Sequence, residues 1–423
     1  MNKYIQSVSR LNYCLFIALF ASLPLPRIFP QVMLIAWAVA WLFEGRFLHH
    51  ANLRLDRRLA PVLSLTAWVL WETLSLLWGQ PDALSTGFNT AHVALLILPF
   101  VLLFGMNERY RWKTIAAVFV VSCVVSVFLY AFTLYWVYNH NYVFADSYFL
   151  RAPFTLSVFD TLLSPIKHRL YYCTLLTLAL VLLFMLRNDF AAWWGKVYGY
   201  AFCIGGALCM LGAVVATYSR ASLFTLVVVA AVALVRHTAQ RYRVRTAAAV
   251  SVLAVIAFIT IWQVHPKMKN LTLDHIKHPY EYMDDPKAQP RLAIWFTALQ
   301  HPEDYVAKGL GVGNSVSYLV KRYQAVPGME KFVADKSHAH NQYLEICMEL
   351  GMAAMLLFVI LWVALPCCYS DGTPRAFATY LSVVFGLNML TDRFLTNIEG
   401  VVFLCAFLLF LACIPSDRCI TTS

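Results

Sequence analysis

Residues 114–138 have the sequence TIAAVFVVSCVVSVFLYAFTLYWVY and contain no charged side chain. An apolar helix of about 20 residues is long enough to cross the hydrocarbon core of a bilayer. Outer-membrane barrels show short alternating segments instead of long continuous apolar stretches. This stretch therefore predicts a transmembrane helix.

The same apolar pattern recurs along the whole chain. The sequence is 61% hydrophobic and 13% charged, with a mean hydropathy of +0.65, which excludes a soluble globular enzyme and a disordered chain. We expect an all-α polytopic membrane protein with about 12 transmembrane helices. The predicted spans are residues 11–23, 29–43, 60–78, 91–105, 114–138, 169–186, 197–217, 221–236, 246–264, 351–368, 376–391 and 400–414.

Lys and Arg are distributed unevenly between the short loops. With the N-terminus in the cytoplasm, 17 of them lie in cytoplasmic segments and 6 in short outer loops. Basic residues collect in the cytoplasmic loops of membrane proteins, so we expect both the N- and C-termini to be cytoplasmic. This distribution also accounts for the net charge of +11 without a nucleic-acid partner.

The longest polar segment covers residues 265–350 and falls on the outer side of the membrane in this topology, which is the periplasmic side if the source is Gram-negative. It is too long to be a simple connector. We therefore divide the chain into residues 1–264 with spans 1 to 9, a periplasmic loop domain at 265–350, and residues 351–423 with spans 10 to 12 and a short cytoplasmic tail. The loop domain has ten basic and ten acidic residues, so bulk charge cannot make it a general polyanion trap.

Two signals on the predicted outer face contain arginine. Arg220 follows Tyr218 and Ser219 at a tight junction between two spans, and Arg291 opens an apolar helical stretch after Pro290. An arginine near the membrane interface either extends to the lipid headgroups or serves a function. Arg291, taken alone, is equally compatible with a solvated loop position.

A third signal is the stretch from Ser337 to Asn341, which contains His338 and His340 shortly before a span. Histidines two residues apart can bind a metal from a strand, but on a helix they diverge by about 200°. No third His or Cys stands nearby with ligand spacing, so we expect no metal. Neutral histidine also suits a general base near pH 7.

Together these motifs resemble the O-antigen ligase and polymerase superfamily. His340-Asn341 is followed after nine residues by Gly351, and the span–Tyr218-Ser219-Arg220–span junction is also similar to the family. So is the helix from Arg291 that leads to the Gly-Leu-Gly-Val-Gly-Asn stretch at 309–314, in which we expect turns and not a nucleotide loop.

The resemblance implies an O-antigen ligase, a glycosyltransferase of the bacterial inner membrane. Such an enzyme moves polysaccharide from undecaprenyl diphosphate to a terminal sugar of lipid A–core at the periplasmic face. Its partners would be this donor, this acceptor and membrane lipid, and it would need no cofactor and no metal.

The resemblance also implies roles for individual residues. The family's essential arginine pair corresponds to Arg220 and Arg291, which would bind the donor diphosphate. Its essential histidine corresponds to His340, and a functional aspartate corresponds to Asp392. His338 is a second candidate for the histidine role. We expect Asn341, Arg393 and Tyr218 to position substrate.

The chemistry that these residue types allow agrees with these roles. Two planar guanidinium groups can each hold diphosphate oxygens bidentately and stay charged. The acceptor hydroxyl needs a base, for which His340 is the candidate; it could instead orient the hydroxyl, or hold a phosphate as an imidazolium. A single displacement with a base inverts the anomeric centre.

Acidic residues on the outer face leave further questions open. Glu72 lies inside a predicted span. A charged carboxylate there needs a partner of opposite charge, such as Arg220 or Arg393, although Glu72 could also be a neutral packing residue. The adjacent pair Asp284 and Asp285 before a proline is more typical of a turn than of a cation site.

Two other functions are compatible with the sequence. An O-antigen polymerase uses the same donor, but polymerase loops often show Arg-x15-Gly, and that spacing leads from Arg291 to Ala307 and from Arg151 to Lys167. A secondary transporter would suit twelve spans, but it usually has polar groups at mid-membrane, whereas the polar candidates here gather on one face. Both arguments favour the ligase.

Overall fold

The computed structural model describes residues 2–45, 57, 59–79, 92–104, 110–139, 167–217, 219–238, 242, 244–246, 249, 280 and 290–415. Within these residues the fold is all-helical, as the sequence predicts. The main apolar helices are α1 (Asn2–Ser22), α2 (Ile28–Glu44), α3 (Leu59–Ser75), α4 (Val93–Phe104), α5 (Trp112–Asn139), α7 (Arg169–Met185), α9 (Lys196–Ala216), α10 (Arg220–His237), α18 (Met352–Ala364), α19 (Thr373–Met389) and α20 (Ile398–Cys413). The shorter ones are α8 (Arg187–Trp194), α14 (Pro290–Leu299), α15 (Ser315–Gln324), α16 (Glu330–Ala334) and α17 (Gln342–Leu350), with 3₁₀ turns η6 (Pro302–Asp304) and η7 (Leu365–Cys368).

Each predicted span except 246–264 coincides with one of the main helices; that segment lies almost wholly outside the described residues. Among the described helices, Trp112–Trp136, Lys196–Ala216 and Arg220–His237 are individually long and apolar enough to cross a membrane. The bent pair Arg169–Met185 and Arg187–Trp194 adds a fourth if it counts as one span. These helices identify an integral membrane protein, and the total of twelve crossings stays a prediction.

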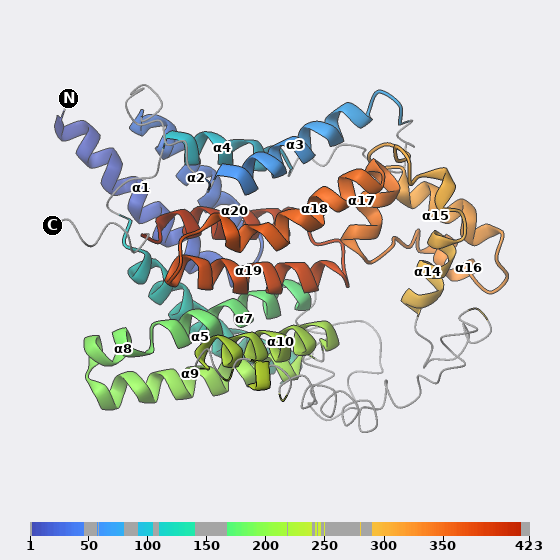
Figure 1. Cartoon of the computed structure of the whole chain (residues 1–423). Helices are drawn as coiled ribbons and strands as arrows, with labels where there is room; N and C mark the ends of the chain where they lie inside the picture. The colour runs from blue at the N-terminus through green and yellow to red at the C-terminus, as the bar shows by residue number, and fades with distance from the viewer. Residues whose placement is uncertain are drawn as a thin grey trace.

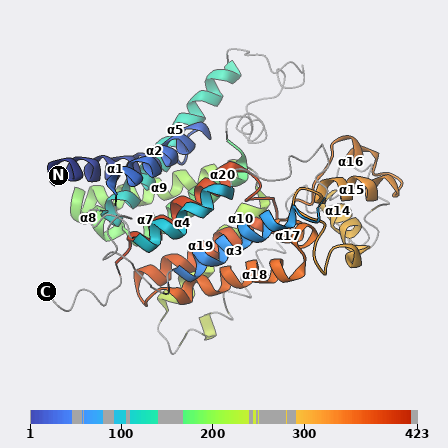
Figure 2. The ribbon, with the colours of Figure 1, turned by 90° about the horizontal axis from the view of Figure 1, so that it is seen from above.

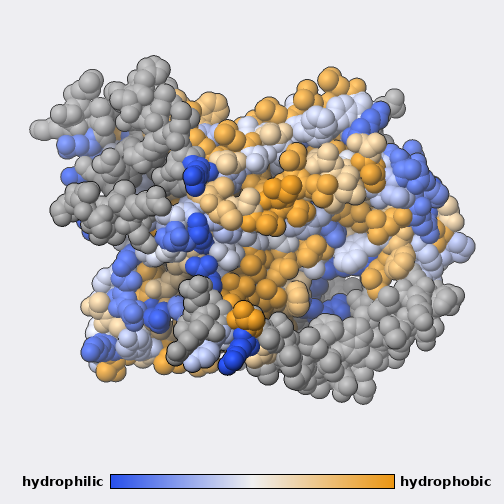
Figure 3. Space-filling view, viewed as in Figure 1, coloured by the Kyte–Doolittle hydropathy of each residue, from blue (hydrophilic) through white to orange (hydrophobic). Residues whose placement is uncertain are grey.

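The long helices run side by side and give the molecule two distinct ends. Both termini lie at the left end in Figure 1, whereas α14 to α17 gather at the right end. The view from above shows the same separation (Figure 2). Apolar side chains cover the middle of the visible surface, and hydrophilic ones lie toward its ends (Figure 3). This is the surface expected of a helical bundle with its middle in lipid.

Aromatic side chains fill much of the core between the helices. Phe20 on α1 contacts Phe119 on α5 and Phe407 on α20 edge-to-face, with ring centroids 6.0 Å and 5.6 Å away. Phe410 lies 5.4 Å from the same Phe20 ring. Such contacts join helices from both halves of the sequence, so the C-terminal helix is an integral part of the bundle.

The segment from 187 to 195 lies between two predicted spans and is largely helical. It forms the short helix α8, which is bent by 65° from α7. Lys113 of α5 pairs with Asp189 on α8 at 2.6 Å, and Phe190 is fully buried. An amphipathic turn of helix therefore continues α7 where the hydropathy pattern alone ends a span.

The described part of residues 265–350 has its own small core, which includes Ala293, Leu319, Tyr323 and Met348. The glycine-rich stretch joins this unit to the bundle. Gly311 has φ +88°, and a Cβ on it would lie 2.3 Å from the Cα of Gly79, just beyond α3. Only glycine permits both this backbone conformation and this approach. The stretch is a packing joint, in agreement with its prediction as a turn.

Candidate active site

The two histidines of the His-Ala-His stretch lie together just before α17. Asn341 is the N-cap of α17, and its Oδ1 accepts hydrogen bonds from the backbone N–H groups of Tyr343 and Leu344 at 3.0 Å and 3.1 Å. His340 precedes this cap with φ +48°, in the left-handed region. Its N–H donates to His338 Nδ1 at 3.0 Å, and the two rings are 3.8 Å apart. A turn, neither a helix nor a strand, therefore brings the rings together.

Helix α14 also contacts this turn, through a hydrogen bond. Trp295 Nε1–H donates to the carbonyl oxygen of Ala339, between the two histidines, at 2.7 Å. Arg291 lies four residues earlier on α14, so it shares a helix face with Trp295. The apolar helix recognised in the sequence thereby places Arg291 on the same side of the molecule as His340.

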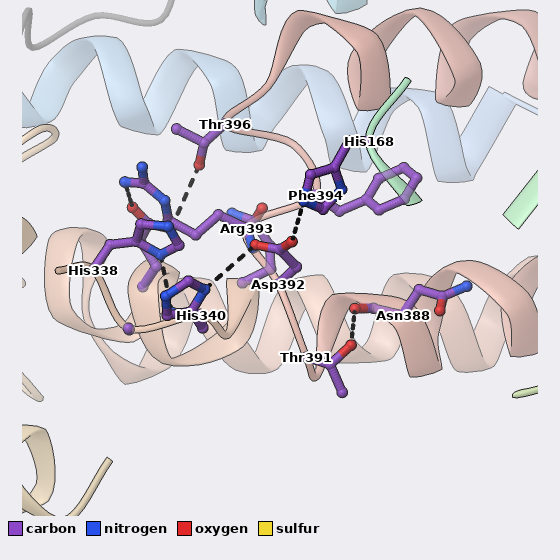
Figure 4. Close-up of polar contacts among 12 residues, drawn as sticks. His168, His338, His340, Asn388, Thr391, Asp392, Arg393, Phe394 and Thr396 are labelled. Atoms are coloured by element: carbon purple, nitrogen blue, oxygen red, sulfur yellow. Dashed lines mark hydrogen bonds and ion pairs between the residues drawn. The ribbon is translucent and has the colours of Figure 1, made fainter. Parts of the chain in front are cut away.

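Asp392 completes the group from the segment between α19 and α20 (Figure 4). Its Oδ1 lies 3.8 Å from His340 Nδ1, and its Oδ2 lies 3.9 Å from His168 Nε2. Burial alone would raise the pKa of Asp392, but the adjacent His340 and His168 rings outweigh it and lower the pKa to about 2. The carboxylate is therefore ionised at any physiological pH.

Side chains of α17 fix the segment that contains Asp392. Arg393 pairs with Glu345 of α17 at 3.0 Å, and Thr396 donates to the other Glu345 oxygen at 3.4 Å. The backbone N–H of Leu395 donates to Gln342 Oε1 at 2.7 Å. Arg393 and Asn341, which we predicted to position substrate, thus both have structural contacts within the protein.

Three arginines, Arg169, Arg220 and Arg291, lie near one another, and Arg291 lies near Asp392. Arg220 is the first residue of α10 and is exposed, whereas Arg291 is partly buried. Burial lowers the pKa of Arg291, the nearby charges of Arg220 and Arg169 lower it further, and Asp392 opposes them. The site therefore has an excess of positive charge, which an anionic ligand would neutralise.

His338 remains neutral in this surrounding. Its pKa is lowered to about 3, first by burial and then by the positive charge of Arg393, against the opposing charge of Asp392. Its Nδ1 already accepts a hydrogen bond. His338 is therefore poorly suited to act as the base or to hold a phosphate as an imidazolium.

Glu72 has a different partner from those considered in the sequence. Its Oε2 lies 2.6 Å from His92 Nδ1, and His92 Nε2 contacts the carbonyl oxygen of Leu395 at 2.8 Å. Arg393, one suggested partner, pairs instead with Glu345. The local sequence could not reveal this pairing, because His92 lies outside the span that contains Glu72.

Several predicted residues cannot be placed in the site. Tyr218, Asp284 and Asp285 lie outside the described residues.

Within the described part of the chain, His338, His340 and Asp392 offer donor atoms within 4.8 Å of one another, a spacing that a metal ion could use.

The comparison with protein families bears on the same region. Residues 205–359 match the family model described as O-antigen ligase. This match confirms the resemblance to the O-antigen ligase superfamily. None of the curated proteins compared with the chain matches it.

The O-antigen ligase match contains Arg220, Arg291, His338 and His340. Asp392, which the sequence motifs already suggested, lies after the matched residues. His168 and Arg169 lie before them, and the geometry alone adds these two residues to the site.

His168 and Arg169 were not among the predicted site residues. A signal for them was present, because the basic cluster 167–169 falls on the predicted outer face just before a span. Nothing in the local pattern distinguished this cluster from an interfacial anchor.

Proposed function

We propose that this protein is an O-antigen ligase that transfers polysaccharide from undecaprenyl diphosphate to a terminal sugar of lipid A–core at the periplasmic face of the bacterial inner membrane. One observation carries the proposal: His340 faces the ionised Asp392 beside a cluster of three arginines at one end of the bundle. The site thus combines a base with a surplus of positive charge, and both are needed for this reaction.

The arginines would bind the donor diphosphate. Attack at the anomeric carbon breaks its bond to the diphosphate oxygen, so negative charge grows on the phosphates in the transition state. Arg220 and Arg291 can each form parallel charge-assisted hydrogen bonds to such oxygens. They accelerate the reaction to the extent that these bonds strengthen as the charge develops.

His340 would take the proton from the acceptor hydroxyl. Asp392, 3.8 Å from Nδ1, would stabilise the imidazolium that forms, in the manner of the aspartate in a catalytic triad. One displacement of this kind inverts the anomeric centre, whereas retention needs a carboxylate nucleophile. Glu345 pairs with Arg393, and Asp392 lies between two imidazoles, which supports inversion.

Transfer without a metal is part of the proposal. The arginine cluster would supply the positive charge that a divalent cation supplies in other phosphate sites. Transfer by the purified protein should therefore survive incubation with EDTA. Loss of transfer that Mg²⁺, Mn²⁺ or Zn²⁺ restores would contradict this part of the proposal and assign the His338, His340 and Asp392 donors to a metal.

The function is tested directly with purified protein, undecaprenyl-diphosphate-linked glycan and lipid A–core. We expect glycan on lipid A–core with the natural enzyme and at least about 100-fold less with His340→Ala, since a general base contributes about 10²–10⁴-fold. Extension of the carrier-linked chain, with no product on lipid A–core, would identify a polymerase. A gene deletion that leaves carrier-linked polymer but removes long chains from lipopolysaccharide would support the ligase in cells.

A further inference from the structure

The residues just before α7 are anchored rigidly in the bundle. Lys167 is buried, and its Nζ donates to the carbonyl oxygens of Leu23 and Leu25, each at 2.9 Å. The same Nζ pairs with Glu399 of α20 and lies 4.8 Å from the centre of the Phe403 ring. The neighbouring His168 therefore starts from a fixed backbone position.

His168 packs against the segment that contains Asp392. Its ring contacts Tyr171 edge-to-face at 5.3 Å, and the Tyr171 hydroxyl donates to the carbonyl oxygens of Arg393 and Phe394 at 3.4 Å and 3.2 Å. Its Nε2 faces Asp392 Oδ2, as Figure 4 shows. The ring and the carboxylate are thus held on the same framework.

Asp392 has one imidazole at each oxygen, His340 at 3.8 Å and His168 at 3.9 Å. Both distances exceed a hydrogen bond by about 1 Å, and catalytic hydrogen bonds commonly tighten only when substrate is bound. The charged groups around His168 are Asp392 and Glu399, which are acidic, and Arg169 and Arg291. Burial and the two arginines outweigh the acids and lower the pKa of His168, so the ring is neutral.

We propose that His168 is the positioning residue for Asp392 in the transfer reaction. Its neutral ring donates from Nε2–H to Oδ2 and so turns Oδ1 toward the Nδ1–H of His340. The inference rests on the proposed function, because the orientation of Asp392 matters only if His340 accepts a proton. His168 itself contacts neither the reacting carbon nor the leaving diphosphate.

The test compares His168→Gln, which keeps an N–H donor near the position of Nε2, with His168→Phe, which keeps the ring but removes the donor. We expect His168→Phe to lower kcat about 10- to 100-fold, since hydrogen bonds to charged groups typically contribute that much. The donor KM should stay within about twofold, and His168→Gln should restore most of kcat. The matched control is His301→Phe, at a half-exposed histidine in the loop domain, which should leave both constants unchanged.

Two kinetic results would overturn the inference. A His168→Phe enzyme with natural kcat and KM would show that the contact has no role. A raised donor KM with natural kcat would place His168 on the diphosphate with the arginines instead. In either case the proposed function stands as long as the natural enzyme transfers glycan to lipid A–core.

A thermal-unfolding cycle tests the contact without catalysis. If His168 and Asp392 interact, the Tm change of the variant with both His168→Phe and Asp392→Asn should differ from the sum of the two single changes. Additive changes would contradict the contact. Non-additive changes in a protein that transfers no glycan at all would sink the proposed function, and with it the positioning role in transfer, while the contact itself would stand.

Discussion

His340 owes its position to an unusual backbone conformation. A φ of +48° is uncommon for a residue with a side chain. Such a conformation costs about 1–3 kcal/mol, and it persists because surrounding contacts determine it. Here those contacts are the Asn341 cap on one side and the Trp295 hydrogen bond to Ala339 on the other. This backbone conformation directs the imidazole toward Asp392 and not along α17.

Lysine should replace Arg220 or Arg291 poorly. An ammonium acts as a point charge and cannot make the two parallel hydrogen bonds of a guanidinium. Losing one charge-assisted bond costs about 1.5–3 kcal/mol, so each Arg→Lys variant should transfer glycan roughly 10- to 100-fold more slowly. The matched control is Arg322→Lys on the surface of α15, where the partner is Asp304. Natural rates in both site variants, at equal expression, would remove these arginines from the site.

The pH dependence of transfer should not depend on His338. With a pKa of about 3, His338 is already neutral throughout pH 5–8. A His338→Gln enzyme should therefore keep the acid limb of its kcat/KM profile at the natural position, although its rate falls. Disappearance of that limb would make His338 the titrating group.

The same shift affects stability. An unfolded histidine takes up a proton below its ordinary pKa of about 6.5, whereas folded His338 does so only near 3. The folded state therefore loses stability as the pH falls from 6.5 toward 3. His338→Gln should reduce the difference in Tm between pH 7 and pH 5, while an unaltered difference would contradict the shift.

The sequence predicted some of these residues and not others for a physical reason. Arg220, Arg291 and His340 lie in short motifs whose order resembles a family. A site role for His168 is evident only from its position beside Asp392 in the folded protein, and no local sequence spacing connects the two positions. Glu345 likewise cannot be distinguished in the sequence from other acidic residues of a helix, because its partner Arg393 is adjacent to it only in the fold.

At the scale of elements, hydropathy predicted the positions of the helices closely. It did not predict how neighbouring helices connect and pack. The apolar run of α7 predicted its end, because Leu186 is the last apolar residue before Arg187. The continuation as α8 depends on the tertiary pairing of Lys113 with Asp189, which no window of sequence contains. The packing of the glycine stretch against the end of α3 also depends on tertiary contacts that no window of sequence contains.

Gly311→Ala should separate the loop unit from α3. The new Cβ would meet the Gly79 backbone at φ +88°, and the left-handed conformation alone costs about 1–2 kcal/mol. We expect a lower Tm and weaker transfer, because Val312 N–H also bonds Ser75 Oγ at this joint. Gly212→Ala in α9, where a Cβ meets nothing within 4 Å, should leave both unchanged or slightly improve Tm. An equally mild Gly311→Ala would show that the joint is not tightly packed.

At the scale of the whole molecule, charge separates along the bundle. Helix α8, which begins at Arg187, lies at the end that contains both termini, whereas α14 to α17, with Arg291 on α14, lie at the other. The prediction from loop charges assigned these two groups to opposite sides of a membrane. The sequence could supply this division because it depends on loop order alone, and not on packing.

The proposed orientation is tested by labelling single introduced cysteines after Cys14 and Cys367, the exposed thiols among the described residues, are replaced. A cysteine at Lys321 on α15 should react with an impermeant thiol reagent in cells with a permeabilised outer membrane. A cysteine at the exposed Asp371, at the opposite end, should react only after the inner membrane is lysed. The reverse pattern would place the site in the cytoplasm and exclude a periplasmic ligase.

The position of Asp392 between the last two helices has a consequence for biosynthesis. A ribosome delivers the arginines and His340 to the membrane well before it delivers Asp392, and α20 anchors Lys167 through Glu399. The proposed catalytic centre therefore cannot form until the hairpin of α19 and α20 has been inserted. If the proposed function is right, a nascent or prematurely terminated chain would contain the arginines and His340 but not the carboxylate that supports His340, and we expect it not to consume carrier lipid.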